Sequence, residues 1–258
     1  MKHRDDIDGL RAVAVLPIVL FHAGFASLSG GFIGVDIFFV ISGLLITSII
    51  LREMDAGLFS IATFYKRRIV RIFPALFVML AVALVMGCVL LLPAEIRLLG
   101  YSAAAAVGFA SNIYFWETAD YFASAAELKP LLHTWSLGVE EQFYLLYPLL
   151  IILVYRRGYR EKLRLIILVL TALSFAASLL LAFRFTDTGF YMLPSRAWEL
   201  GIGALAALGS FPQVQSSKAR DVLSVIGLTL IILGVALIDA EKPFPAPWAL
   251  LPCVGTAL

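Results

Sequence analysis

Apolar residues fill long, nearly uninterrupted stretches of this chain, and short polar or basic stretches separate them. Runs of about 18 to 22 apolar residues match the length of a helix that crosses a hydrocarbon core of about 30 Å. The pattern predicts an all-α protein, a polytopic transmembrane helical bundle with about eight complete membrane segments. We expect these segments at residues 8–26, 32–51, 73–92, 96–116, 131–154, 163–183, 190–209 and 222–239.

A further apolar run, from Trp248 to Leu258, is too short to cross a bilayer as a helix. It predicts a truncated ninth membrane segment. We therefore expect residues 1–258 to form one transmembrane domain that is incomplete at its C-terminus.

Basic residues in the short loops predict the orientation of the segments. Lys2 and Arg4 precede the first segment, and a second basic group lies between the second and third segments. Because Lys and Arg favour the cytoplasmic side, both regions and the N-terminus are predicted to be cytoplasmic. The loop 155–164 is equally basic, yet three candidate segments separate it from the previous basic loop. Either 96–116 or 131–154 enters the membrane without crossing it, or the charge rule fails here.

Residues 58–72 interleave apolar and basic positions and include Phe and Tyr. This composition is typical of a helix that lies in the plane of a membrane surface. We expect a short interfacial helix there, on the cytoplasmic side.

The composition, 61% hydrophobic with a mean hydropathy of +0.95, leaves too little polar surface to coat a soluble globule of this size. A net charge of +2, spread along the chain, argues against a nucleic-acid-binding protein. Cys88 and Cys253 lie in apolar runs and match no disulfide or metal-ligand spacing, so no metal site is expected.

Arg11 and His22 lie in the first apolar segment, where charged and titratable side chains are costly and therefore typical of a functional site. Their helical spacing places them within about 20° of one helix face and about 16 Å apart along the axis. His22 can act as a base, an acid or a nucleophile at neutral pH. The alternatives are that His22 is a structural polar group and that Arg11 extends to the lipid headgroups.

Asp36 opens the second segment, a few residues inside the outer surface and at the depth that His22 reaches. An isolated carboxylate in lipid needs a partner. We expect an Asp36–His22 pair in which the carboxylate fixes the imidazole tautomer and raises its basicity, as in a catalytic triad. The alternative is a carboxylate that caps the helix or forms a structural pair.

Arg68 and Arg71 are three positions apart and therefore neighbours on one helix face, with Lys66 and Arg67 beside them. Paired guanidinium groups bind phosphate through two hydrogen bonds. A nucleotide-bearing donor such as a coenzyme A thioester fits these cations, and its flexible arm would reach into the membrane. Ordinary topology anchoring explains the same cations without a ligand.

His133, Glu140 and Tyr144 share a stripe if their segment is helical, with Glu141 about 100° away. Two adjacent carboxylates in apolar surroundings need a partner, which Arg196 can supply. Glu140 and Glu141 are candidate catalytic acid or base groups. His133 and Tyr144 are candidate substrate-binding groups.

Arg196 and Glu199 are also charged residues in apolar surroundings, in a later segment. Their spacing also lets them pair on their own helix, which would be a structural role. Otherwise both are candidate substrate-binding residues.

Five stretches carry a family resemblance, in the order DGLRAVAVLPIVLFH, GGFIGVDIFFVISGLLI, FYKRRIVRIFPAL, PLLHTWSLGVEEQFYLLYP and RAWELGIGAL. With them the chain resembles the acyltransferase-3 family of bacterial integral-membrane acyltransferases, which O-acylate surface polysaccharides. The resemblance implies a donor thioester, usually acetyl-CoA, bound from the cytoplasm. Arg11 and His22 then match the family's essential pair, and Arg68 and Arg71 its basic motif. The sequence HTWSLGVEEQFY is similar to the corresponding sequence in members with a C-terminal extracytoplasmic SGNH-hydrolase-like domain. The resemblance implies such a domain as a partner of this chain.

The hypothesis is a bacterial inner-membrane O-acyltransferase. It would move an acyl group, expected to be acetyl, from a cytoplasmic acyl-CoA to a hydroxyl of an extracytoplasmic carbohydrate. Lipopolysaccharide O-antigen, peptidoglycan and exopolysaccharide are the candidate acceptors. In this hypothesis Arg11 steers the donor, and His22, held by Asp36, activates the acceptor hydroxyl or carries the acyl group.

Two alternatives belong to other classes. A proton-coupled transporter or flippase would use His22, Glu140 and Glu141 as a proton relay, because intramembrane titratable groups mark such pathways equally well. The paired repeats with broken helices that are common in secondary transporters are not found in the sequence. A membrane scaffold without chemistry would leave the face shared by Arg11 and His22 without a purpose.

Overall fold

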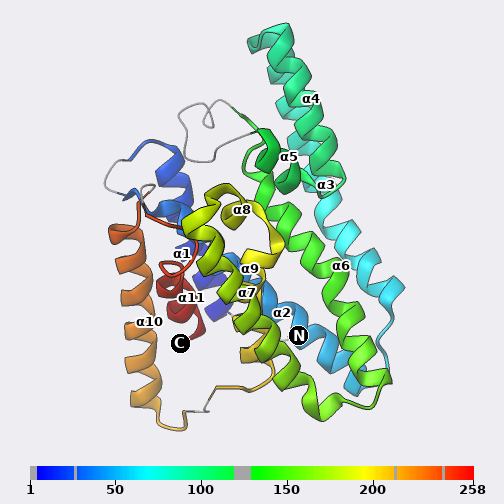
Figure 1. Ribbon diagram of the computed structural model, residues 1–258, viewed down its shortest axis with the longest axis vertical. Helices are drawn as coiled ribbons and strands as arrows, with labels where there is room; N and C mark the ends of the chain where they lie inside the picture. The colour runs from blue at the N-terminus through cyan, green and yellow to red at the C-terminus, as the bar shows by residue number, and fades with distance from the viewer. Residues whose placement is uncertain (1–4, 26–27, 119–128, 212–213, 240–241) are drawn as a thin grey trace. The chain divides into compact units, whose positions relative to one another are not determined.

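The computed structural model describes residues 5–25, 28–118, 129–211, 214–239 and 242–258, whose regular secondary structure is helical, with no β-strand among them. In chain order the α-helices are α1 (Asp5–His22), α2 (Gly34–Asp55), α3 (Ile61–Leu90), α4 (Pro93–Val107), α5 (Ser111–Thr118), α6 (Thr134–Arg156), α7 (Leu163–Arg184), α8 (Thr186–Tyr191), α9 (Leu193–Ala207), α10 (Ser217–Leu237) and α11 (Leu250–Ala257) (Figure 1). The predicted all-α class is confirmed over these residues. Lys2 and Arg4 lie outside them.

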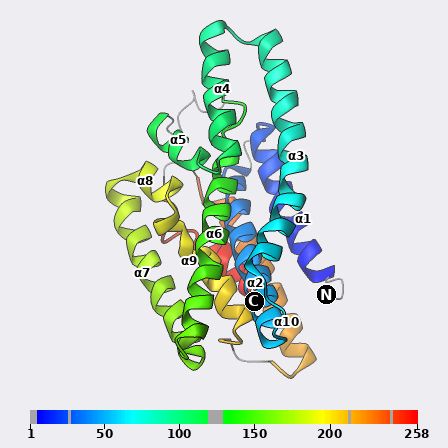
Figure 2. The ribbon, with the colours of Figure 1, turned by 90° about the vertical axis from the view of Figure 1, so that its right-hand side faces the viewer.

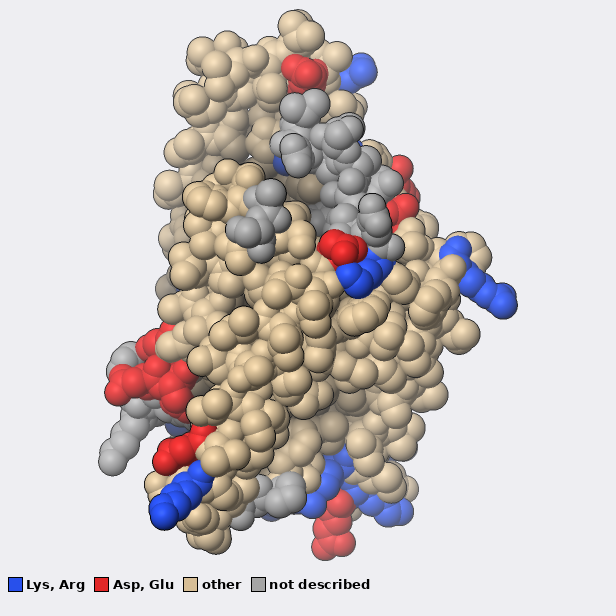
Figure 3. Space-filling view, turned by 90° about the vertical axis from the view of Figure 1, so that its left-hand side faces the viewer, with Lys and Arg blue, Asp and Glu red and all other residues tan. Residues whose placement is uncertain are grey.

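Five helical stretches are long and apolar enough to cross a membrane, namely Gly31–Asp55, Ile61–Leu90, Thr134–Arg156, Arg160–Arg184 and Ser217–Leu237. The predicted count of about eight complete segments is not confirmed in the described part of the chain. Three acidic residues crowd the first turn of α1, and α4 and α9 have only 15 residues each. Figure 3 shows one face on which uncharged side chains cover most of the surface, as expected of a protein that faces lipid.

The predicted segment 96–116 is two helices. α4 ends at Val107, with Gly108 as its C-cap; Phe109 takes a left-handed backbone conformation with φ +52°, and α5 begins at Ser111. Neither α4, with 15 residues, nor α5, with 8, reaches the about 20 residues that a span needs. α6 is a continuous helix of 23 residues. Of the two candidates for a segment that does not cross, 96–116 is therefore the one without a spanning helix.

The predicted interfacial helix at 58–72 is wrong as a separate element. Ser60 caps α3 by accepting a hydrogen bond from the backbone N–H of Thr63 at 3.4 Å, and α3 then runs for 30 residues, past Pro74. At about 1.5 Å per residue this helix is about 45 Å long. The basic residues after the cap belong to the first turns of a long span, which a composition window cannot distinguish from a short surface helix.

The chain forms two compact units. The first comprises residues 1–49, 154–190 and 194–258, and the second comprises residues 50–153 and 191–193. In the first unit, Ile37 and Ile41 of α2 pack with Ala14 of α1 and Ile231 of α10 in a buried cluster. In the second unit, α3 and α4 form an antiparallel hairpin (Figures 1 and 2).

Glycines let three helices of the first unit approach at backbone distance. A Cβ on Gly34 of α2 would lie 2.2 Å from the carbonyl oxygen of Ala14 in α1. A Cβ on Gly43 of α2 would lie 1.9 Å from a carbonyl oxygen of α9, and one on Gly203 of α9 would lie 1.9 Å from a carbonyl oxygen of α2. Any larger residue would push these helices apart, so α2 is held between α1 and α9.

Candidate active site

α1 runs without a break from Asp5 to His22, so Arg11 and His22 lie on one face as their spacing predicts. The Arg11 guanidinium lies 3.1 Å from the carboxylate of Asp8, one turn earlier, and its side chain is 33% exposed. His22 is the last residue of α1 and is exposed. The face therefore carries a cation near the start of the helix and an imidazole at its end.

The tautomer of His22 follows from its hydrogen bond. Nδ1 lies 2.8 Å from the backbone carbonyl oxygen of Ile18. Because a carbonyl oxygen can only accept, Nδ1 carries the proton and donates it. In the neutral ring, Nε2 then keeps its lone pair and can accept a proton or attack a carbonyl carbon. A backbone carbonyl thus performs the orienting role that the sequence predicted for Asp36.

Asp36 is paired with Arg196. Arg196 Nη2 lies 3.1 Å from Asp36 Oδ1, and Arg196 Nη1 lies 3.1 Å from Glu199 Oε1. All three residues are completely buried. The predicted Asp36–His22 pair is therefore wrong, and the alternative of a structural pair is the one found. The sequence had suggested Arg196 as a partner for the acidic residues of α6, and the ion pairs found for it are those with Asp36 and Glu199.

The backbone of α2 explains why Asp36 points as it does. Gly34 faces α1, and two residues of helix rotate the chain by about 200°, so Asp36 faces away from α1. Gly43 follows Asp36 by seven residues, returns to within about 20° of the same face, and is the residue that touches α9. A prediction based only on depth in the membrane therefore chose the wrong partner for Asp36, namely His22 instead of Arg196.

Three aromatic rings surround the guanidinium of Arg196. The distances from its central carbon to the ring centroids are 5.4 Å for Phe39, 5.6 Å for Phe190 and 5.4 Å for Phe244. With a side-chain exposure of 1% for Arg196 and 0% for Glu199, neither is placed to contact a substrate. The pairing of these two residues on their own helix is what the structure shows, and it favours a structural role over the substrate-binding role.

A second polar cluster joins α3 and α6. The hydroxyl of Tyr144 donates to the carboxylate of Glu140, one turn earlier on α6. The guanidinium of Arg68 lies over the ring of Tyr144, 4.6 Å from its centroid. Arg68 and Arg71 both act electrostatically on Glu141, whose Oε1 is buried and accepts no hydrogen bond from the described residues. The arginines of α3 thus balance the carboxylates of α6.

The four cations predicted to bind the donor face different neighbours. Arg67 Nη2 lies 2.8 Å from Glu53 at the end of α2, and its side chain is 51% exposed. Arg68 turns towards α6, while Lys66 and Arg71 are exposed. The four basic residues therefore all belong to α3 in the second unit, but their side chains do not converge on one preformed phosphate site.

Asn112 and Gln142 form a network that the sequence analysis missed. Gln142 Nε2 donates to Asn112 Oδ1 at 2.8 Å and to the carbonyl oxygen of Phe109 at 3.0 Å. Asn112 Nδ2 donates to the carbonyl oxygen of Tyr191 at 3.1 Å. These bonds tie the start of α5 to α6. The sequence held two signals of this network. Asn112 is an amide inside an apolar run, and Gln142 is an amide beside two carboxylates.

His133 lies in the turn before α6, one residue short of the helix, and is exposed. It therefore does not share the helical stripe of Glu140 and Tyr144, and that part of the prediction is wrong.

Among the described residues, no group of three His, Cys, Asp or Glu side chains is placed to hold a metal ion.

Comparison with known proteins gives the chain its relatives. It is 35% identical over 238 residues to an uncharacterised protein of Haemophilus influenzae, covering 86% of this chain and 95% of that protein. It is 36% identical to the peptidoglycan O-acetyltransferase OatA of Listeria monocytogenes and 34% identical to the O-acetyltransferase OatA of Staphylococcus aureus. These matches cover 94% and 91% of this chain but only 41% and 39% of the two enzymes, so the chain spans about two fifths of their length.

No solved structure matches the chain. The model of the acyltransferase domain family matches residues 4–258, which is nearly the whole sequence. The chain therefore belongs to this acyltransferase family.

Proposed function

We propose that this chain transfers an acyl group, in the first instance acetyl, from an acyl-CoA thioester to a hydroxyl group of an extracytoplasmic carbohydrate. The proposal rests on one observation in a chain of the acyltransferase family. The hydrogen bond from His22 Nδ1 to the Ile18 carbonyl leaves Nε2 as a basic nitrogen. The names of the two O-acetyltransferase relatives support O-acetylation, and the Listeria name supports a cell-wall polysaccharide as the acceptor.

In the proposed step, the acceptor hydroxyl oxygen attacks the thioester carbonyl carbon. A C–O bond forms and the C–S bond breaks, while the hydroxyl proton passes to His22 Nε2 and then to the leaving thiolate. A positioned general base of this kind contributes about 10²- to 10⁴-fold in rate. Arg11 lies about 16 Å along α1 from His22, too far to touch the same carbonyl group. It therefore fits a role in holding the donor.

The cations at the start of α3 suit the phosphate groups of the donor. Arg71 and Lys66 are exposed, and Arg68 lies on the same side of the helix as Arg71. Guanidinium groups bind phosphate oxygens in a bidentate manner. If the nucleotide stays on these cations and only the acyl unit moves on, no multiply charged group has to enter lipid, where its cost would be very large.

We place the chain in the bacterial inner membrane with a cytoplasmic N-terminus. If α4 and α5 stay on the outer side, α6 returns the chain to the cytoplasm and the basic residues after Arg156 lie inside. The positive-inside rule is then obeyed by the basic loops on both sides of this region. The length of α4, 15 residues, supports this topology.

The test uses membranes that contain the chain and acetyl-CoA labelled in its acetyl group. His22→Asn keeps a side-chain N–H near the Ile18 carbonyl but has no basic nitrogen. We expect transfer of label to glycan and release of coenzyme A thiol to fall by about 10²-fold or more. Equal transfer by the wild type and by His22→Asn would remove His22 from the chemistry. Solute movement without thiol release would favour a transporter instead.

A matched pair of double variants tests the donor site. Arg68→Gln/Arg71→Gln removes two guanidinium groups three positions apart, and Arg157→Gln/Arg160→Gln removes two with the same spacing in the loop after α6. We expect the first pair alone to raise the KM for acetyl-CoA, by about 10-fold or more, and to weaken its salt dependence. Equal effects of both pairs would indicate topology anchoring.

A further inference from the structure

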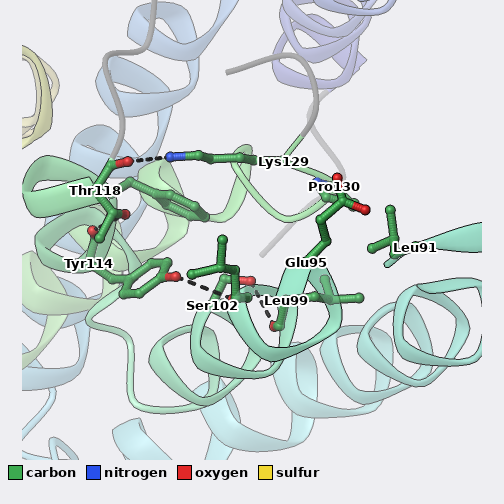
Figure 4. A pocket seen from close by; sticks show the side chains of 10 residues that line it. Leu91, Glu95, Leu99, Ser102, Tyr114, Thr118, Lys129 and Pro130 are labelled. Atoms are coloured by element: carbon green, nitrogen blue, oxygen red, sulfur yellow. Dashed lines mark hydrogen bonds between the residues drawn. The ribbon is translucent and has the colours of Figure 1, made fainter. Parts of the chain in front are cut away.

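A cavity of about 220 Å³ lies between α4 and α5 in the second unit, apart from the groups discussed above. Leucine side chains of α4 form one wall, and Phe115 of α5 closes another. Polar groups enter the cavity from Glu95, Ser102, Tyr114 and Lys129 (Figure 4). The cavity therefore combines an apolar floor with several convergent polar groups, the composition of a small-molecule site.

Each polar group is anchored by the backbone yet keeps bonding capacity. Glu95 accepts a backbone N–H at 2.8 Å through Oε2, and Ser102 donates to a backbone carbonyl at 2.8 Å. The Tyr114 hydroxyl donates to a carbonyl at 3.3 Å, and the Lys129 ammonium donates to the carbonyl of Thr118. Two hydroxyl oxygens can still accept, the carboxylate retains Oε1, and the ammonium has further N–H groups.

This set of groups matches one sugar ring. A sugar presents hydroxyl groups that donate and accept on its edge, and C–H groups on its face that pack against apolar and aromatic side chains. The carboxylate of Glu95 accepts hydroxyl protons, and Lys129 donates to hydroxyl oxygens. The volume is below the about 300 to 1,000 Å³ of pockets that enclose a whole drug-sized ligand, so one ring of a longer chain fits.

We propose that this cavity binds one sugar residue of the acceptor glycan. The inference rests on the proposed function, because that topology places α4 and α5 on the outer side, where the acceptor is found. Charged residues lie on the two helices and after α5, namely Glu95 and Arg97 on α4, Glu117 on α5, and Lys129, which agrees with contact with water rather than lipid.

The test measures protection of a cysteine at the rim by a soluble sugar. Thr118→Cys lines the cavity, and Cys88→Ser removes the exposed native thiol, while Cys253 is buried. The chain is placed in nanodiscs and treated with a membrane-impermeant maleimide, with and without a β-1,4-linked trisaccharide of N-acetylglucosamine. We expect labelling without sugar and concentration-dependent protection with it.

A matched pair of variants locates the binding. Glu95→Gln changes a carboxylate in the cavity, and Glu117→Gln makes the same change on α5 outside it. We expect Glu95→Gln to raise the sugar concentration for half-protection by about 10-fold and Glu117→Gln to leave it unchanged. Ser102→Leu, which fills the cavity, should abolish protection while labelling persists.

The inference is overturned if the trisaccharide gives no protection, or if Glu95→Gln and Glu117→Gln shift it equally. It is also overturned if Thr118→Cys is labelled in detergent but not in nanodiscs, since lipid would then occupy the cavity. Thiol release from acetyl-CoA, measured on the wild-type chain, separates this failure from failure of the proposed function. Release that depends on His22, without sugar protection, removes only the sugar site.

Discussion

Arg196 forms ion pairs with two carboxyl groups that are completely buried, those of Asp36 and Glu199. Removing it in Arg196→Met leaves both carboxyl groups without a cation, and loss of one member of such a buried cluster costs about 3 to 5 kcal/mol. Glu199→Gln leaves one cation and one carboxylate, a neutral pair, and should cost less. We expect the apparent unfolding temperature in detergent to fall strongly in the first variant and weakly in the second.

The comparison between Arg196→Met and Glu199→Gln tests whether charge balance around Arg196 stabilises the cluster. An equal or larger loss in Glu199→Gln would show that the cluster is not held by charge balance around Arg196. Because all three side chains are enclosed, we also expect the KM for acetyl-CoA to change little in any Glu199→Gln protein that folds.

Lys129 gives a pH-dependent prediction outside the membrane segments. Partial burial lowers the pKa of its ammonium group below the ordinary value of 10.5. Between the lowered and the ordinary pKa the unfolded chain binds more protons, so this group's contribution to stability rises with pH through that window. Acylation of Lys129 by an amine reagent, followed by mass spectrometry, should show a pH midpoint below 10.5.

The same chain in denaturant supplies the control for Lys129. There the midpoint should return to about 10.4, the value of an unperturbed lysine. Equal midpoints in the folded and denatured chain would contradict burial of this side chain.

Sequence reasoning at the residue scale succeeded where one helix decided the outcome. The shared face of Arg11 and His22 and the contact of Glu140 with Tyr144 both follow from spacing along a single helix. It failed for Asp36, because the choice between two neighbouring helices depends on which glycines permit close approach. That choice is a property of packing, which hydropathy and depth do not encode.

The close contact of α2 and α9 depends on glycine at the scale of the helix pair. Gly203→Ala would place a Cβ 1.9 Å from a carbonyl oxygen of α2, so the helices must separate and the Asp36–Arg196 contact must lengthen. Gly100→Ala adds a Cβ to α4 with no atom within 4 Å. We expect the first change to lower the apparent unfolding temperature and the second to raise it slightly, because alanine favours helix by about 1 kcal/mol.

Similar unfolding temperatures for the Gly203→Ala and Gly100→Ala proteins would show that the α2–α9 contact is looser than the structure indicates. A loss in Gly203→Ala that Gly43→Ala reproduces would locate the effect in the contact between the two helices, since each glycine faces the backbone of the other helix.

The predicted segments agree best with helices whose apolar sequence is continuous. The segment 163–183 corresponds to α7 (Leu163–Arg184), and 222–239 falls largely within α10 (Ser217–Leu237). The segment 96–116 fails because a turn at Phe109 interrupts an alanine-rich run without lowering its hydropathy. Hydropathy averages over a window, so it cannot detect a single residue whose backbone conformation interrupts a helix.

At the scale of the whole chain, the break at Phe109 is the basis of the membrane topology that we propose. With 96–116 counted as a span, the basic loop after α6 would lie outside, against the preference of Lys and Arg. With α4 and α5 as short helices that do not cross, an even number of crossings, α3 and α6, separates the two basic loops. Both loops then lie on the same side of the membrane.

This topology predicts the labelling of three single cysteines in a Cys88→Ser chain. Ala56→Cys precedes α3, Arg157→Cys follows α6, and Thr118→Cys lies at the end of α5. In intact cells an impermeant maleimide should label only Thr118→Cys, whereas inverted membrane vesicles should expose the first two. Labelling of Arg157→Cys from outside would mean that α4 and α5 together cross the membrane, and these helices would then not lie on the outer side, where the proposed sugar site requires them.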